Sequence, residues 1–388
     1  MSPSIRFPEF TGEWERCVLG DVLEFSNTRI NSSELNSGNY VSTENILQNF
    51  QGIVKARSIP EDTNVMAFSC GNILLSNIRP YLKKVWKATF NGGCSSDVFV
   101  LQANSNIDAD YLHYVVANDK FIGFVMNGAK GVKMPRGDKN QMKTYSLSLP
   151  SIKEQRKISR FLSFLDERIA VQSRLIDRLQ SLMIGLNNSL YEQYGNDITT
   201  SFMELGYSYS GLSGKSAKDF GSGKPFITYL NVYSNIIVDE TDYQYVRIND
   251  GEKQNIVRTG DVLFTLSSET PEEVGIGSVY LGEKEVYLNS FCFGIHIERN
   301  QLAYSPYLSY YVTSTAFRKF IYPFAQGSTR FNLCKADFEK ASIKLPSLDN
   351  QKRISAMLDC IAEKIRAEKA ILEYYNIQRQ YLLRQMFI

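Results

Sequence analysis

A long internal repeat constrains this chain more than any other feature of its sequence. Residues 149–169 read LPSIKEQRKISRFLSFLDERI, and residues 345–365 read LPSLDNQKRISAMLDCIAEKI. The two copies align at a constant offset of 196 residues, which pairs Gln155 with Gln351. A repeat of this length indicates a duplicated structural unit.

Both copies also carry the spacing of a coiled coil, because apolar residues alternate every three and four positions and so fall on one stripe of a helix. The stripe of the first helix is Ile158, Leu162, Leu165, Ile169, Gln172, Ile176, Leu179, Met183, Leu186 and Leu190. The stripe of the second is Ile354, Leu358, Ile361, Ile365, Glu368, Leu372, Tyr375, Arg379, Leu382 and Met386. The alternative is a pair of ordinary amphipathic core helices. The unbroken spacing and the charged outer positions favour two long paired helices.

The polar breaks in the two stripes lie at equivalent positions, since Gln172 and Glu368 are also 196 residues apart. In an antiparallel pair related by a two-fold pseudo-axis, equivalent residues face each other at one layer only. We expect Gln172 and Glu368 to form that layer and to fix the register of the helices.

The length of 388 residues and the hydrophobic content of 43% allow more than one core, so two or more domains are expected. No apolar run approaches the roughly 20 residues of a bilayer span, and the first ten residues lack the apolar segment of a signal peptide. The six cysteines form no CxxC pair, which argues against a zinc ribbon or a disulfide framework. We therefore expect a soluble, cytoplasmic protein with reduced thiols and no membrane contact.

The net charge of only +2 means that any nucleic-acid site must be local. Two stretches, residues 63–96 and 299–336, contain no Asp or Glu but several Lys and Arg interleaved with aromatic residues. Such interleaving suits phosphate contact and base stacking, although a solvated protein face is the more frequent explanation of either run alone.

The regions between the helical stretches share one plan. Residues 1–148 read as a mixed α/β domain of short β-rich runs and Gly, Asn and Ser turns, followed by a helix over 110–118 and a strand over 145–149. Residues 198–344 repeat that plan: the 196-residue offset holds from about residue 110 onward, and earlier parts diverge. The predicted division is domain one at 1–148, a helix at 149–197, domain two at 198–344 and a helix at 345–388. A duplicated scaffold with divergent faces suggests two recognition modules on one shared scaffold.

This layout resembles the specificity subunit of type I restriction-modification enzymes. The residues that carry the resemblance are the junctions LPSIKEQRKI and LPSLDNQKRI, with FPEFTGEWERCVLGDV, NILLSNIRPYLKK, GLSGKSAKDFG, TGDVLFTLSS and AQGSTRFNL. It covers essentially the whole chain. It implies two α/β target recognition domains, separated by two long helices that pair as an antiparallel coiled coil. It also implies that each domain reads one part of a bipartite double-stranded DNA site, and that the helices dock two methyltransferase subunits and, through that complex, restriction and translocase subunits.

Candidate DNA contacts lie in the motif loops. In the first domain they are Ser76, Asn77, Arg79, Tyr81, Lys83, Lys84, Lys130, Lys133 and Arg136. In the second they are Ser213, Lys215, Ser216, Lys218, Ser328, Thr329, Arg330 and Asn332. The first domain lacks a GSTR-like run and has Gly-Val-Lys-Met-Pro-Arg at residues 131–136 instead.

A search for catalytic motifs finds none. Gly214-Lys215-Ser216 fails the phosphate-loop pattern because Tyr209 stands where the first glycine is required. The two histidines, His113 and His296, are in no metal-ligand motif, and His113 reads as a core or helix-face residue. We therefore expect a non-catalytic subunit without cofactor or metal. The remaining alternative is a coiled-coil scaffold that binds only proteins, which leaves the Lys and Arg loops unexplained.

Overall fold

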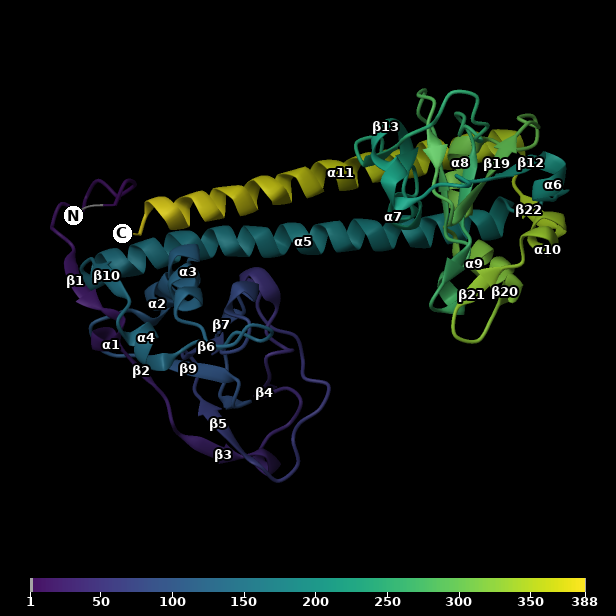
Figure 1. Ribbon diagram of the computed structural model, residues 1–388. Coiled ribbons are helices and arrows are strands. Elements are labelled where there is room, and N and C mark those ends of the chain that lie inside the picture. Colours follow the sequence, from purple (N-terminus) through teal and green to yellow (C-terminus); the bar gives the residue numbers. More distant parts are fainter. Residues whose placement is uncertain (1–2, 388) are drawn as a thin grey trace. The chain divides into compact units, whose positions relative to one another are not determined.

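The computed structural model describes residues 3–387 and divides into two compact units (Figure 1). Unit 1 is the chain up to Ser173 together with the segment from Ala370 onward, and unit 2 is Arg174–Lys369. Both boundaries fall inside long helices, and Ser173 and Lys369 are themselves 196 residues apart. Each unit therefore contains one predicted recognition domain and one half of each long helix.

Unit 1 combines short strands with four α-helices that precede the long one. Its strands are β1 (Glu15–Val18), β2 (Leu23–Phe25), β3 (Arg29–Asn31), β4 (Tyr40–Val41), β5 (Asn64–Phe68), β6 (Ile73–Ser76), β7 (Val85–Lys87), β8 (Gly92–Cys94), β9 (Val98–Ala103) and β10 (Ser146–Leu149). Its helices are α1 (Leu19–Val22), α2 (Ala109–Val116), α3 (Asp119–Asn127), α4 (Lys139–Lys143) and the first half of α5 (Ile152–Tyr194). The strands form sheets ordered β1-β10, β2-β9-β6-β7 and β3-β5-β8-β4.

Unit 2 shares part of this plan and has additional strands and helices. Its strands are β11 (Ile198–Thr200), β12 (Gly206–Ser210), β13 (Phe220–Ile227), β14 (Tyr243–Val246), β15 (Val262–Thr265), β16 (Ser267–Ser268), β17 (Gly277–Val279), β18 (Tyr287–Leu288), β19 (Cys292–Ile297), β20 (Ala325–Gln326), β21 (Phe331–Leu333) and β22 (Ile343–Leu345). Its helices are α6 (Phe202–Leu205), α7 (Tyr229–Ser234), α8 (Ser305–Tyr311), α9 (Thr315–Ile321), α10 (Lys335–Lys340) and the first half of α11 (Leu348–Gln385). Its sheets are β11-β22, β12-β19-β15-β17, β14-β13-β18 and β16-β21-β20.

The central sheets of the two units are built alike. In unit 1 the order β2-β9-β6-β7 is antiparallel throughout, and in unit 2 the order β12-β19-β15-β17 is antiparallel throughout. Ile73 pairs with Leu101 in the first sheet as Val262 pairs with Ile295 in the second. Each sheet is buried on both faces, because its central strands are apolar along their length. Ile73 packs in the core that holds the following helices and Leu74 in a second cluster, as Val262 and Leu263 do in unit 2. The duplicated α/β plan predicted from the sequence is confirmed.

The long helices pair in opposite directions within the units. In unit 1, Leu162 and Leu165 of α5 share a core with Leu382 and Met386 near the end of α11. In unit 2, Leu186 and Leu190 near the end of α5 pack with the core that holds Ile354 and Leu358 near the start of α11. The first half of each helix thus lies with the second half of the other, as the predicted antiparallel pair requires. Even these two helices, the longest among residues 3–387, lack an apolar stretch fit to cross a bilayer.

The remaining stripe residues lie where a helical seam requires them. Ile158, Ile176 and Ile365 are buried. Ile169, Leu179, Ile361 and Leu372 are partly buried, and Gln172 is also partly buried. Glu368 is 5% exposed and its carboxylate lies 2.5 Å from the Lys364 ammonium one turn earlier. The pairing of Gln172 with Glu368 stays a prediction.

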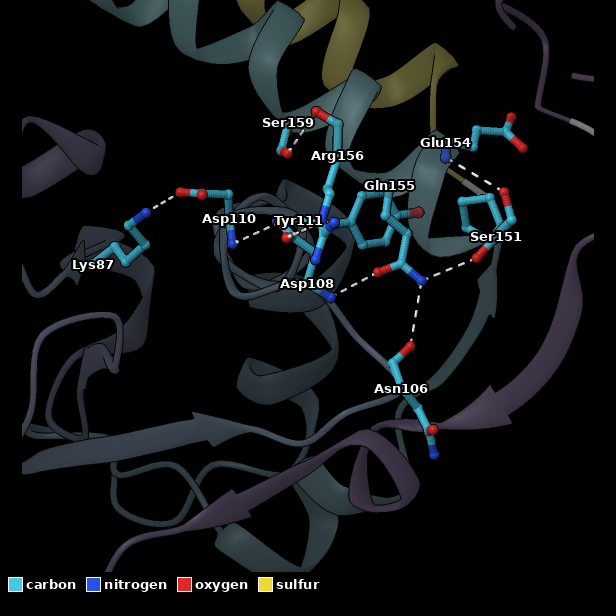
Figure 2. A network of polar contacts seen from close by, with 11 residues as sticks. Lys87, Asn106, Asp108, Asp110, Tyr111, Ser151, Glu154, Gln155, Arg156 and Ser159 are labelled. Carbon is cyan, nitrogen blue, oxygen red and sulfur yellow. Dashed lines mark hydrogen bonds and ion pairs between the residues drawn. The ribbon is translucent and has the colours of Figure 1, made fainter. Parts of the chain in front are cut away.

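Each helix is joined to its own domain by a buried glutamine. Gln155 is 1% exposed; its Oε1 accepts the backbone N–H of Asp108 at 2.8 Å, and its Nε2 donates to the carbonyl of Pro150 at 2.9 Å (Figure 2). Gln351 is 0% exposed and makes the same two bonds, at 2.8 Å each, to the N–H of Tyr304 and the carbonyl of Pro346. The side-chain amide thus ties the start of the long helix to the residue before α2 or α8.

Replacing Gln155 with Ala removes the acceptor from the Asp108 N–H and should lower the free energy of unfolding by about 1–3 kcal/mol, since a buried donor is left unpaired. Gln380→Ala, at an exposed position on α11 in the same unit, is the matched control and should change stability by less than about 0.5 kcal/mol. Urea unfolding of the full chain measures both. Equal midpoints for the two variants would contradict the assigned role.

Candidate nucleic-acid interface

Two candidate stretches of unit 1, some fifty residues apart in sequence, meet at one edge of the domain. The N–H of Arg79 donates to the carbonyl of Pro135 at 2.8 Å, and the N–H of Gly137 donates to the carbonyl of Asn77 at 3.0 Å. Ile78 also forms an isolated bridge with Arg136. The loop after β6 therefore supports the segment that carries Lys130, Lys133 and Arg136.

That segment is a short hairpin closed between Lys130 and Arg136, whose backbone groups exchange two hydrogen bonds of 3.0 and 2.9 Å. Gly131, the first residue of its turn, has a φ of +97°, which favours glycine because the residue has no Cβ. Val132, Lys133 and Met134 are exposed at the tip. We call residues 130–136 the first hairpin.

Unit 2 has the corresponding hairpin between β20 and β21. Gln326 pairs with Asn332 in the register of these strands, and Asn332 also pairs with Ser267 of β16. Gly327 opens the turn with a φ of +143°. Ser328, Thr329 and Arg330 are exposed at its tip. We call residues 326–332 the second hairpin.

The two hairpins are equivalent residue by residue. Their closing pairs, Lys130 with Arg136 and Gln326 with Asn332, are separated by the same 196 positions as the helical repeats. Met134 accordingly occupies the position of Arg330. The absence of a GSTR-like run from the first domain therefore reflects a change of side chains on an unchanged backbone. Met134 was missed as a candidate, although the offset that aligns Gly131 with Gly327 was sufficient to find it.

Several cations of unit 1 form ion pairs at the surface. The guanidinium of Arg136 lies 2.9 Å from Asp97, the ammonium of Lys130 lies 3.0 Å from Asp138, and that of Lys83 lies 2.6 Å from Asp119. The hydrogen bond from Lys130 lowers the pKa of the Asp138 carboxyl. Exposed pairs of this kind contribute at most about 1 kcal/mol, so a phosphate can displace the carboxylate.

The other candidate DNA contacts of unit 1 divide into side chains that bond to the domain's own backbone and side chains that are exposed to solvent. Ser76 is 1% exposed and its hydroxyl donates to the carbonyl of Ile78 at 2.9 Å. Lys84 donates to the carbonyl of Thr43 at 2.6 Å, and burial lowers the pKa of its ammonium. Arg79 and Tyr81 are exposed, with Tyr81 at 48%. The outward side chains lie on the loop that Ser76 and Lys84 help to hold.

In unit 2, the loop of residues 211–219 is held by Lys215. Its side chain is 5% exposed, lies 2.5 Å from the Glu252 carboxylate and donates to the carbonyl of Arg247 at 2.6 Å. The hydrogen bond from Lys215 lowers the pKa of Glu252 to about 2. The hydroxyl of Ser216 donates to Asp219 at 2.8 Å, which caps the short turn that follows. Ser213 and Lys218 remain exposed around this anchor.

Most aromatic residues of the second acid-free stretch are buried or partly buried, although Tyr322 is 47% exposed. Tyr307, Tyr311 and Phe317 are each no more than 2% exposed and belong to the core of unit 2. Arg318 donates to the backbone carbonyls of Glu272, Val274 and Gly275 at 2.6 to 2.9 Å. The expectation that this aromatic and basic interleaving serves base stacking is therefore wrong for these side chains: they pack the domain.

Metal chemistry has little support in this part of the molecule. Within residues 3–387, no group of three or more His, Cys, Asp or Glu side chains is placed to hold a metal ion. Burial raises the pKa of the Cys94 thiol to about 12, which keeps it protonated near neutral pH and disfavours the thiolate that a metal ion would bind. Burial also lowers the pKa of His113 to about 4, so this imidazole is neutral near neutral pH.

The family model of the type I restriction modification DNA specificity domain matches residues 11–181 and again residues 212–374. The chain belongs to this family. The two matches cover both recognition domains and most of both long helices, which confirms the resemblance seen in the sequence.

Two curated members of the specificity family align with parts of the chain. The specificity subunit of the type I restriction enzyme EcoDI from Escherichia coli is 33% identical over 93 residues, 24% of this chain and 20% of that protein. The StySPI specificity subunit from Salmonella potsdam is 27% identical over 150 residues, 38% of this chain and 32% of that protein. The chain thus spans less than a third of the length of either relative in these alignments.

Solved structures from type I systems share the fold over nearly the whole chain. A chain solved in work on complex assembly and conformational transition of the type I restriction-modification system is 20% identical, with a TM-score of 0.60 over 96% of this chain and 97% of its own. The S subunit from M. genitalium is 15% identical, with a TM-score of 0.57 over 100% of this chain and 99% of its own. At these identities the likeness establishes the specificity-subunit fold.

The backbone geometry of the first and second hairpins predicts unequal effects of matched glycine substitutions. A Cβ at Gly327 would lie 2.1 Å from the carbonyl oxygen of Arg330, whereas a Cβ at Gly131 would lie 3.2 Å from that of Met134. Both positions also have positive φ, a strain of about 1–3 kcal/mol for alanine. We expect Gly327→Ala to open the second hairpin and Gly131→Ala to strain the first without opening it. Amide hydrogen exchange at the closing residues, Asn332 and Arg136, measures this; equal exchange in both variants would contradict the geometry.

Proposed function

We propose that this chain is the DNA sequence-recognition subunit of a type I restriction-modification complex, with each unit reading one half of a bipartite site. The observation that carries the proposal is the pair of equivalent exposed hairpins with different side chains. Their tips read Val-Lys-Met in unit 1 and Ser-Thr-Arg in unit 2 on the same backbone. A duplicated frame with changed tips suits two readers of different half-site sequences.

The chemistry of the two tips supports different contacts. Arginine can donate two hydrogen bonds to a guanine edge, whereas lysine and hydroxyl groups suit phosphate or single base contacts. Arg330 provides the first kind, and Ser328, Thr329 and Lys133 provide the second. Phosphate contacts would position each unit, and base contacts would set its preference.

Partners are part of the same proposal. Large apolar side chains are exposed along the long helices, among them Phe161 and Phe164 on α5 and Tyr374 and Ile377 on α11. Exposed apolar residues at helical spacing fit docking by the helices of two methyltransferase subunits, through which restriction and translocase subunits assemble. We place catalysis in those partners and the complex in the cytoplasm, where host DNA is found.

A scaffold that binds only proteins is the competing function, and the hairpins distinguish it. A scaffold would assemble with methyltransferase subunits but would confer no sequence preference on them. A gel-shift assay with those subunits and randomised duplexes separates the two functions, since a recognition subunit must enrich one bipartite sequence.

Arg330→Ala should weaken binding of the complex to its site by about 1–3 kcal/mol and relax preference at one base position. Lys133→Ala should weaken binding to all sequences alike and reduce the salt slope. Arg299→Ala, at an exposed arginine outside the hairpin in unit 2, is the matched control and should leave preference unchanged. Unchanged affinity for both Arg136→Ala and Arg330→Ala would exclude the hairpins as DNA contacts.

Helix length should set the gap between half-sites if the helices act as a spacer. Inserting four residues after Ser173 and four after Lys369, at repeat-equivalent positions, adds about 6 Å and about one turn to each helix. We expect the unread gap to grow by one or two base pairs, at about 3.4 Å each, while both half-site sequences stay the same. Two-residue insertions rotate the helix face by about 200° and should abolish recognition. Sequencing the methylated sites of each variant measures the gap. An unchanged gap in an active four-residue variant would show that helix length does not set the half-site spacing.

A further inference from the structure

Unit 2 contains a polar pocket that neither the second hairpin nor the long helices line. Its cavity volume is about 200 Å³, and Tyr207, Tyr209, Arg258, Asp261 and His296 form part of its wall. These residues come from β12, from the turn before β15 and from β19, so the pocket opens beside the central sheet. It has no role in the proposed reading of DNA by the hairpins.

A buried carboxylate forms the base of the pocket. Asp261 is 0% exposed; its Oδ2 accepts from the Tyr209 hydroxyl at 2.5 Å and from the Arg258 backbone N–H at 2.9 Å. Its Oδ1 lies 2.6 Å from Nδ1 of His296. Burying a carboxylate without hydrogen-bond partners costs several kcal/mol of folding free energy. The residues around Asp261 supply those partners and form a hydrogen-bonded polar cluster.

The turn itself does not need the charge, as unit 1 demonstrates. There Asn72 stands before β6 in the place of Asp261, and its Oδ1 accepts the Ser69 N–H at 2.8 Å just as Asp261 accepts from Arg258. The strand registers place Gln102 where unit 2 has His296. Unit 1 therefore forms the same turn and sheet with two neutral side chains, Asn72 and Gln102, in place of Asp261 and His296. The Asp261 and His296 pair is therefore an addition of unit 2 that folding of the turn leaves unexplained.

The basic groups that line the pocket are one guanidinium and one imidazole, beside the neutral Gln254 and Asn255 amides and two tyrosine hydroxyls. Because Nδ1 of His296 is engaged by Asp261, Nε2 is the nitrogen that remains for the pocket. The Arg258 side chain is exposed at the rim, and its guanidinium carries up to five N–H donors. Asp261 is the one acid among the lining residues, and its oxygens are occupied. The guanidinium donors and the imidazole nitrogen that remain for a ligand thus suit an oxyanion.

We propose that this pocket binds a phosphate group between the Arg258 guanidinium and Nε2 of His296. Guanidinium groups match phosphate oxygens in two-pronged geometry. A phosphate monoester or inorganic phosphate has both a P–OH donor and P–O⁻ acceptors, so it satisfies Nε2 whether that nitrogen accepts or donates. A backbone phosphodiester has acceptors only and binds when the imidazole is protonated. The two sources of the group are a free phosphate or monoester and the DNA backbone.

The two histidines of the chain make a direct test possible. In the full-length chain with ¹³C-labelled histidine, titration with inorganic phosphate at constant ionic strength should shift the His296 resonances saturably. His113 lies in unit 1 with its Nδ1 buried, so its resonances should stay in place and act as the internal reference.

Variants and a competitor complete the experiment. Arg258→Ala keeps the backbone N–H that bonds Asp261 and should weaken phosphate binding about tenfold or more. Arg247→Ala, an exposed arginine of the same unit outside the pocket wall, should bind as the parent chain does. Duplex DNA that displaces inorganic phosphate identifies the backbone as the source, and binding of both together identifies a free phosphate or monoester. The proposal is overturned if His296 does not respond to phosphate, or if Arg258→Ala responds as the parent chain does. Failure here leaves the proposed DNA-recognition function intact, since that function is tested at the hairpins.

Discussion

The buried amide at the base of each long helix is the interaction on which the rest of the structure depends. Gln155 and Gln351 sit one turn into α5 and α11, where a helix still has backbone groups without partners. Each amide uses both of its ends, accepting from the chain just before α2 or α8 and donating to the proline carbonyl that precedes its own helix. A second acceptor, the carbonyl of Asn106 or Leu302, lies 196 residues from its counterpart as well. An amide with donor and acceptor fixed at once admits one orientation, so each glutamine links the start of its helix to its domain in one geometry.

Further along the helices the two units preserve the position of a contact while exchanging the groups that make it. In unit 1, Asn118 at the start of α3 donates to the carbonyl of Leu383 on α11 at 2.9 Å. In unit 2, the repeat equivalent of Leu383 is Asn187 on α5, which donates to the carbonyl of Tyr310 at the same distance. Tyr114 donates to Asp166 in unit 1, and its repeat equivalent Tyr310 donates to Asp359 in unit 2. The two aspartates lie at positions of the long helices that differ by about one turn. A buried hydrogen bond needs one donor and one acceptor, and either the helix or the domain can supply the donor. The packing of helix on domain can therefore stay the same when the bonding residues change.

The sequence predicted the parts of the fold that depend on local pattern. Three-and-four spacing gave the long helices, and β-rich runs between Gly and Asn turns gave strands such as Ile73–Ser76 and Val98–Ala103. Side-chain direction in the candidate loops could not be read in this way, since it is decided by residues distant in sequence. Lys215 faces inward because Glu252, 37 residues later, supplies a carboxylate, and Lys84 faces inward because the carbonyl of Thr43 is in reach. The acid-free stretch of unit 2 was misleading for a related reason. Most of its Tyr and Phe residues pack in or against the core, and the Arg318 guanidinium donates to backbone carbonyls instead of pairing with a carboxylate. The Asp261 and His296 pair joins positions 35 residues apart in no known spacing and was invisible before the strands were registered.

The hairpins show how recognition can change while the frame stays constant. Backbone demands fall on a few positions: a glycine with positive φ at 131 or 327, and the closing pairs that bridge to the loop or strand beside them. The three tip residues after each glycine have no such demand, and they are exposed in both units. Substitution there alters the donors and acceptors presented to a partner without touching the buried glutamine, the central sheet or the helical seam. If the tips read DNA as proposed, stability and specificity are carried by separate residues, and duplicated domains on one scaffold can then diverge in the sequences they recognise.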